Sequence, residues 1–102
     1  MKLNEVLSKV KSADIIGDAS VDITGVNIDS RRIQPGHLFV AVRGTQVDGH
    51  SFIPKAIEQG AVAVLCEDVP AVQTEGVTFV KVASTEAAVG PVATMFYGDP
   101  ST

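Results

Sequence analysis

Short apolar stretches alternate with polar, turn-forming segments along the chain, and their spacing predicts the elements in order. Four apolar residues near the N-terminus recur at helical spacing and predict one stripe of a short helix: Leu3, Val6, Leu7 and Val10. The segment DIIGD at 14–18 predicts a brief strand or turn. Residues 21–29 alternate apolar and polar side chains, which predicts a half-buried strand with Gly25 as a bulge or a shift of phase.

The middle of the chain has the pattern of a buried strand, a helix and a second buried strand. After a Gln-Pro-Gly turn at 34–36, the apolar run HLFVAV at 37–42 predicts a central strand. The segment 51–61 predicts a helix that begins near Pro54 and ends at Gly60. We expect four residues on its apolar side: Phe52, Ile53, Ala56 and Ile57. The run AVAVLCE at 61–67 predicts the second buried strand.

The last third of the chain predicts a third core strand at 77–83 and a helix over 84–98, with Ser84 as its N-cap. Pro91 lies inside this helix and lacks the N–H that would bond to the carbonyl of Ala87. We therefore expect a kink, or a helix that starts anew at Pro91. The order of elements predicts an α/β fold, with a small mixed or parallel sheet flanked by helices.

Composition narrows the class of protein. A chain of 102 residues with 45% apolar residues fits one domain with a real core. The net charge of −4 argues against non-specific binding to nucleic acid. Cys66 is the single cysteine and we expect it to be a small buried hydrophobe, in a chain with no disulfide and no zinc cluster. Without a signal peptide or a membrane-spanning stretch, the expected location is the cytoplasm.

Familiar catalytic motifs are absent from this sequence. None of its lysines follows a glycine, which excludes a phosphate-binding P-loop. Neither the dinucleotide fingerprint G-x-G-x-x-G nor the hydrolase motif G-x-S-x-G occurs. We therefore assign no catalytic residue and no metal site to the chain, and look instead for a binding site.

The candidate binding residues lie at 29–50, where polar segments flank the predicted strand at 37–42. The hydroxyls of Ser30 and Thr45 and the backbone of the Gly44–Val47 loop offer donors and acceptors that match the imide edge of a pyrimidine. Three arginines are candidates for pairing with phosphates: Arg31, Arg32 and Arg43.

Structural roles explain many of the same residues. Asp29 and Ser30 are typical turn-capping residues, and Asp29 with Arg31 is more simply explained as an ion pair that holds the loop. Asp48 and Gly49 are typical of the residues that immediately precede a helix. Structural roles are also expected for the two histidines, His37 and His50.

Taken together, these motifs resemble the N-terminal domain of the Mur ligases, most closely the MurE type. The resemblance rests on D-S-R, P-G-x-L-F-V-A, G-x-x-x-D-G-H-x-F-I and G-A-x-A-V, in this order, and it continues to FYGDPS near the C-terminus. It implies a UDP-MurNAc-binding domain over residues 1–97. It also implies that 98–102 begins a linker to an ATP-binding domain that this sequence does not contain.

The resemblance also implies the activity of a longer, three-domain enzyme. That enzyme would be a cytoplasmic, ATP- and Mg²⁺-dependent ligase that adds meso-diaminopimelate or L-lysine to UDP-MurNAc-L-Ala-D-Glu in peptidoglycan synthesis. ATP would phosphorylate the substrate carboxylate, and the incoming amine would attack the acyl phosphate. The present chain would hold the uridine nucleotide, with no cofactor of its own and no catalysis alone.

Position by position, the resemblance implies that Ile28, Ser30, Thr45, Gln46 and Val47 hold the uracil and ribose. Some relatives carry histidine at the position of Thr45, so in this chain a side-chain contact there is either lost or made by the Thr45 hydroxyl. Two alternatives stay open: the MurF type, which shares D-S-R and D-G-H, and a free-standing α/β interaction domain without a small ligand. A stand-alone nucleotide-binding regulatory module is a weaker third.

Overall fold

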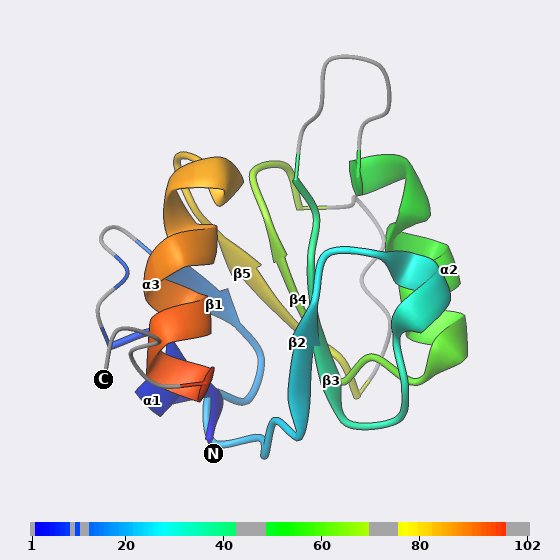
Figure 1. The fold of residues 1–102 in the computed structure, drawn as a ribbon, viewed down its shortest axis with the longest axis horizontal. Coiled ribbons are helices and arrows are strands. Elements are labelled where there is room, and N and C mark those ends of the chain that lie inside the picture. Colours follow the sequence, from blue (N-terminus) through cyan, green and yellow to red (C-terminus); the bar gives the residue numbers. More distant parts are fainter. Residues whose placement is uncertain (1, 9, 11–12, 43–48, 70–75, 98–102) are drawn as a thin grey trace.

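The computed structural model describes residues 2–8, 10, 13–42, 49–69 and 76–97 of the chain. Within these ranges a five-stranded sheet lies between α1 and α3 on one face and α2 on the other (Figure 1). The strands are β1 (Asp14–Ile16), β2 (Gly25–Asn27), β3 (His37–Val40), β4 (Ala63–Cys66) and β5 (Thr78–Lys81). The helices are α1 (Leu3–Val6), α2 (Ile53–Gln59) and α3 (Thr85–Tyr97), with 3-10 turns η1 (Ser30–Arg32) and η2 (Gly49–Phe52).

The sheet is mixed, which is one of the two arrangements that the sequence predicted. Its order is β1-β5-β4-β3-β2, and the pairs β2–β3, β3–β4 and β4–β5 are parallel. Only β1 is antiparallel, against β5. The carboxyl ends of the four parallel strands therefore meet at one edge of the sheet, which is called the carboxyl edge below.

Both faces of the sheet are covered, and this explains why its central strand β4 is apolar throughout. All four residues of β4 are buried. Along β3, Leu38 and Val40 join the cluster beneath α1 and α3, whereas Phe39 joins the cluster beneath α2. Alternate residues of a strand point to opposite faces, so a strand with a helix layer on each side buries both sets.

Helix α2 connects the carboxyl edge with the opposite edge of the sheet. Pro54 lies in its first turn, and Gly60 ends it with φ 117°, the left-handed conformation that favours glycine. The amide of Gly36, in the turn before β3, donates to the carbonyl of Gly60 at 3.0 Å. The end of α2 is thus fixed beside the start of β3, and its first residues lie near the carboxyl edge.

Helix α3 continues through Pro91 as one helix, so of the two predicted alternatives the new helix start is wrong, and the kink stays a prediction. Ser84 caps its first turn as predicted, because its hydroxyl accepts from the amide of Ala87 at 3.2 Å. Gly90 has no Cβ to meet the ring of the following proline, and this allows the helical backbone to continue. The buried side chains of Ala88 and Val92 hold the helix to the sheet on either side of the lost hydrogen bond.

Gly25 is not a bulge, since its pairing with His37 continues without a break to Asn27 opposite Phe39. The strand covers only Gly25–Asn27, shorter than the predicted 21–29. The N-terminal helix is confirmed over Leu3–Val6.

Candidate functional site

The predicted binding segments follow adjacent parallel strands. Ile28 and Ser30 come directly after β2, and the loop with Thr45, Gln46 and Val47 comes after β3. Ligands of open α/β sheets bind outside the carboxyl ends of the strands, so the topology places both segments where a site is expected. The three loop residues lie outside the described ranges, and their contribution stays a prediction.

Ile28 is an isoleucine exposed to solvent at the carboxyl edge. It follows the last residue of β2 and is 58% exposed, the largest exposure among the described large hydrophobic residues that face solvent. It offers a contact surface to a ligand placed beside the strand ends.

Ser30 presents a hydroxyl from an otherwise buried position. The residue is 5% exposed and opens η1. Its hydroxyl forms no hydrogen bond to the described residues, yet no described side-chain nitrogen or oxygen is fully buried without a partner. The hydroxyl must therefore be part of the small surface that Ser30 exposes, where it can donate or accept.

Asp29 and Arg31 form the ion pair that the sequence predicted. The Asp29 carboxylate accepts from the amide of Arg31 at 2.9 Å and from its guanidinium at 3.2 and 3.1 Å. These hydrogen bonds lower the pKa of Asp29 and raise the pKa of Arg31. The pair bridges the two residues on either side of Ser30 and so holds the turn together.

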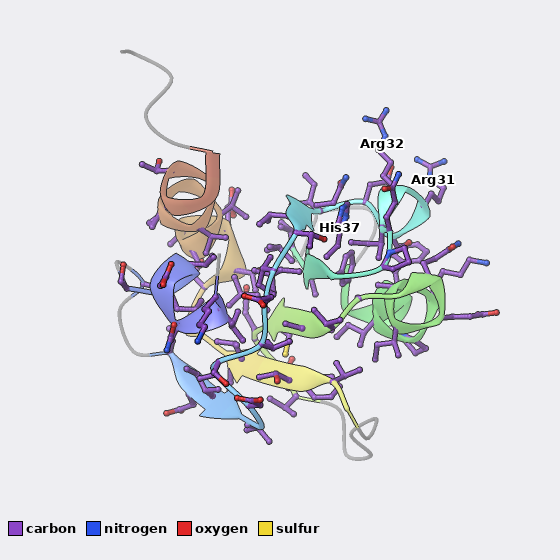
Figure 2. The ribbon with its side chains drawn as sticks, turned by 90° about the horizontal axis from the view of Figure 1, so that it is seen from below. Arg31, Arg32 and His37 are labelled. Atoms are coloured by element: carbon purple, nitrogen blue, oxygen red, sulfur yellow. The ribbon has the colours of Figure 1, made fainter. Side chains whose placement is uncertain are left out.

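Arg31 and Arg32 project from η1 away from the body of the molecule (Figure 2). The Arg31 side chain is 84% exposed even though it contacts Asp29. Both guanidinium groups are accessible to anions, and the pairing with phosphates stays a prediction. Arg43, the third arginine of the predicted set, lies outside the described ranges.

His37 and Cys66 have structural surroundings. The amide of Gln34 donates to His37 Nδ1 at 3.3 Å, and the ring lies against Gly25 at the edge opposite the candidate site. Cys66 is 0% exposed, and burial raises the pKa of its thiol to about 11. These surroundings agree with the predicted structural role of His37 and confirm the buried Cys66. The side chain of His50 lies outside the described ranges.

Phe52 is a residue that sequence reasoning misplaced. It was expected on the buried side of the helix at 51–61, but α2 begins at Ile53, and Phe52 is its N-cap and 41% exposed. Pro54 was the available signal, because proline favours the first helical turn and so puts the helix start just before it.

A sequence model described as Mur ligase family, catalytic domain, matches residues 22–97. The chain belongs to the Mur ligase family. Among curated Mur ligases, the UDP-N-acetylmuramoyl-L-alanyl-D-glutamate--2,6-diaminopimelate ligase of Bacteroides fragilis is 54% identical over 101 residues, and that of Phocaeicola vulgatus is 55% identical. Each match covers 99% of this chain and 21% of the relative. The chain thus spans about a fifth of the length of these relatives.

Solved Mur ligase structures share the fold. The UDP-N-acetylmuramoylalanyl-D-glutamyl-2,6-diaminopimelate--D-alanyl-D-alanyl ligase of Acinetobacter baumannii superposes with a TM-score of 0.74 at 19% identity, over 92% of this chain and 21% of that one. The MurF ligase of Thermotoga maritima, solved in complex with ADP, gives 0.61 at 28% identity, over 81% and 18% of the two chains. The α/β fold is therefore that of a Mur ligase domain.

The described part of the chain has neither a membrane-spanning helix nor a cluster of metal-binding side chains. No helix there is both long and apolar enough to cross a membrane. No group of three or more histidine, cysteine, aspartate or glutamate side chains is arranged there to hold a metal ion.

Proposed function

We propose that this chain is the substrate-binding N-terminal domain of a MurE-type ligase, and that it holds the uridine nucleotide of UDP-MurNAc-L-Ala-D-Glu. The single observation that carries the proposal is the pairing of an exposed Ile28 with the surface hydroxyl of Ser30, at the carboxyl edge. An apolar surface beside a donor and acceptor suits a pyrimidine ring, which needs both. Thr45, Gln46 and Val47 would complete the contacts with uracil and ribose.

The whole enzyme would add meso-diaminopimelate to the D-Glu carboxylate, by way of an acyl phosphate made from ATP. The choice of diaminopimelate over L-lysine is supported by the names of the relatives at 54% and 55% identity. ATP and Mg²⁺ belong to the missing central and C-terminal domains, since this chain has no Gly-Lys dipeptide. Residues 1–97 would form the binding domain and 98–102 the start of the linker, in a cytoplasmic protein.

In this arrangement the domain positions the substrate and takes no part in the reaction itself. Holding the uridine end of a long substrate restricts the opposite, peptide end, and the energy of binding remote groups helps to orient the reacting carboxylate. The Asp29–Arg31 pair would keep Ser30 in place before the ligand arrives. No proton or acyl transfer is assigned to any residue of this chain.

A MurF-type enzyme is the nearest second candidate, because solved MurF structures have this fold. The sequence identities favour the MurE type, since the A. baumannii MurF chains are only 18–19% identical. The two types would share the uridine site and differ in the length of the bound peptide.

The test is an amide-resolved NMR titration of the chain with UDP-MurNAc-L-Ala-D-Glu, with ADP as the control ligand. We expect shifts confined to residues 28–31 and 44–48 with the uridine ligand and none with ADP. Ser30→Ala should weaken binding, whereas Ser20→Ala should not, because Ser20 is an exposed serine whose hydroxyl bonds to Asp18. The absence of selective shifts would contradict the proposal and favour an α/β interaction domain without a small ligand.

A further inference from the structure

Four large hydrophobic residues of the described chain are exposed, and they fall into two groups. Ile15 and Ile16 are 38% and 41% exposed on β1, the antiparallel strand at the end of the sheet. Ile28 and Phe52 are 58% and 41% exposed, and both lie at the carboxyl edge. The second group lies at the proposed substrate site, where Ile28 has an assigned contact and Phe52 has none.

The position of Phe52 follows from the course of α2. Gly60, the C-cap of α2, is tied to the turn before β3 because its carbonyl accepts from the amide of Gly36, at the amino end of the strand. The N-cap of the same helix, Phe52, must therefore lie toward the carboxyl end. Helix α2 also packs against η1, which begins at Ser30, so Phe52 and Ser30 belong to elements that adjoin on the same side of the sheet (Figure 1).

Phe52 is also the one exposed phenylalanine among those whose side chains the structure describes. Phe39 and Phe79 are each 1% exposed and form part of the core beneath α2. The residue after Phe52, Ile53, is 2% exposed and faces that core. The helix therefore buries its apolar face from Ile53 onward and leaves the ring of Phe52 outside.

We infer that Phe52 is a further substrate-binding residue, whose ring packs against the uracil base on the apolar surface that Ile28 begins. This inference rests on the proposed function. A base bound by the Ser30 hydroxyl presents two faces that need cover from water, and proteins commonly cover such faces with an aromatic ring. Ile28 and Phe52 are the exposed apolar side chains of the described carboxyl edge that can supply this cover.

The experiment records the uracil H5 and H6 resonances of UDP during titration with the chain. Stacking on an aromatic ring moves these protons upfield, an effect that a merely structural phenylalanine does not produce. We expect an upfield shift with the wild-type chain and with Phe52→Tyr, and none with Phe52→Leu. Phe52→Leu should bind UDP about tenfold more weakly, in the range typical of losing one base–aromatic contact.

Ile16→Ala is the matched control, because Ile16 has the same exposed fraction as Phe52 but lies on β1. It should leave the affinity for UDP unchanged. If Phe52→Leu unfolds, the upfield shift in the wild type and its retention in Phe52→Tyr still test whether the ring at position 52 stacks on the uracil.

The outcomes separate the two proposals. Wild-type binding of UDP over ADP, without an upfield shift and with unchanged affinity in Phe52→Leu, overturns the role of Phe52 and leaves the uridine site standing. A wild-type chain that does not bind UDP overturns both.

Discussion

Glu67, just after β4, binds Thr85 in the first turn of α3 through two hydrogen bonds to one carboxylate oxygen. Glu67 Oε2 accepts from the amide of Thr85 at 3.1 Å and from its hydroxyl at 3.0 Å. Thr85 is 0% exposed, so its polar groups have little access to water. These two bonds give partners to an amide and a hydroxyl at the N-terminus of α3 that would otherwise be buried and unpaired.

Removing this carboxylate should destabilise the domain. Glu67→Ala leaves the buried Thr85 hydroxyl and an amide without partners, which costs about 1–3 kcal/mol in the free energy of unfolding. Urea unfolding followed by circular dichroism measures the change. Glu58→Ala, at an exposed position on α2, is the control and should change stability little. Equal effects of the two substitutions would show that the Glu67–Thr85 contact is not stabilising.

The Asp29–Arg31 pair should be visible in a pH titration. Because Arg31 lowers the pKa of Asp29 in the folded chain, the pair stabilises the fold above the pKa of the unfolded carboxyl group. This stabilisation is lost as pH falls through the folded pKa. Arg31→Ala should move the pKa of Asp29 upward, toward its ordinary value, as followed by the carboxyl carbon in NMR. An unchanged pKa would mean that the pair does not form in solution.

A side chain at Gly25 should displace the ring of His37. A Cβ at this position would lie 2.5 Å from His37 Nε2, closer than atoms can approach. Gly25→Ala should therefore lower the free energy of unfolding by about 1–3 kcal/mol, as over-packing typically does. The same substitution in a His37→Ala background should cost much less, because the obstructing ring is gone. Additive effects in this double-mutant cycle would rule out the contact.

Pro91 should lower the free energy of unfolding, whereas Pro54, the other proline in a helix, should raise it. Pro91→Ala restores the hydrogen bond to the carbonyl of Ala87, and we expect the free energy of unfolding to rise by about 1–2 kcal/mol. Pro54→Ala is the matched control with the opposite expectation. Pro54 lies in the first turn of α2, where no hydrogen bond is lost, and its removal increases the entropy of the unfolded chain. Thermal unfolding of both variants tests the difference in sign.

Cys66 should be inert while the chain is folded. Burial raises the pKa of its thiol to about 11, so at pH 8 the reactive thiolate is scarce as well as inaccessible. We expect a thiol-specific reagent to label Cys66 only in denaturant. Rapid labelling of the folded chain would contradict the buried position.

Much of the fold was predictable because its signals are local. The apolar spacing of Leu3, Val6 and Leu7 predicts a helix, and the buried strands appear as short apolar runs such as 61–67. The Asp29–Arg31 pair was also predictable, since its partners are two residues apart. In each case the sequence contains the whole interaction within a few positions.

What the sequence missed depends on which segments meet in space. The helical period suggested a buried Phe52, but only the packing of α2 on the sheet decides where that period begins. Gly25 was expected to be a bulge or a shift of phase, but it pairs in register and lies against a histidine twelve positions away on β3.

The sequence by itself therefore determined the elements, their order and the family resemblance, because periodicity and motifs are properties of neighbouring residues. The tertiary structure alone decided the exposure of Ile28, Ser30 and Phe52, because exposure depends on what the rest of the chain covers. It also decided pairings such as that of the Thr78 hydroxyl with the carbonyl of Asp18, at 2.8 Å and 60 positions apart. Such contacts form only once the register of the sheet brings distant segments together.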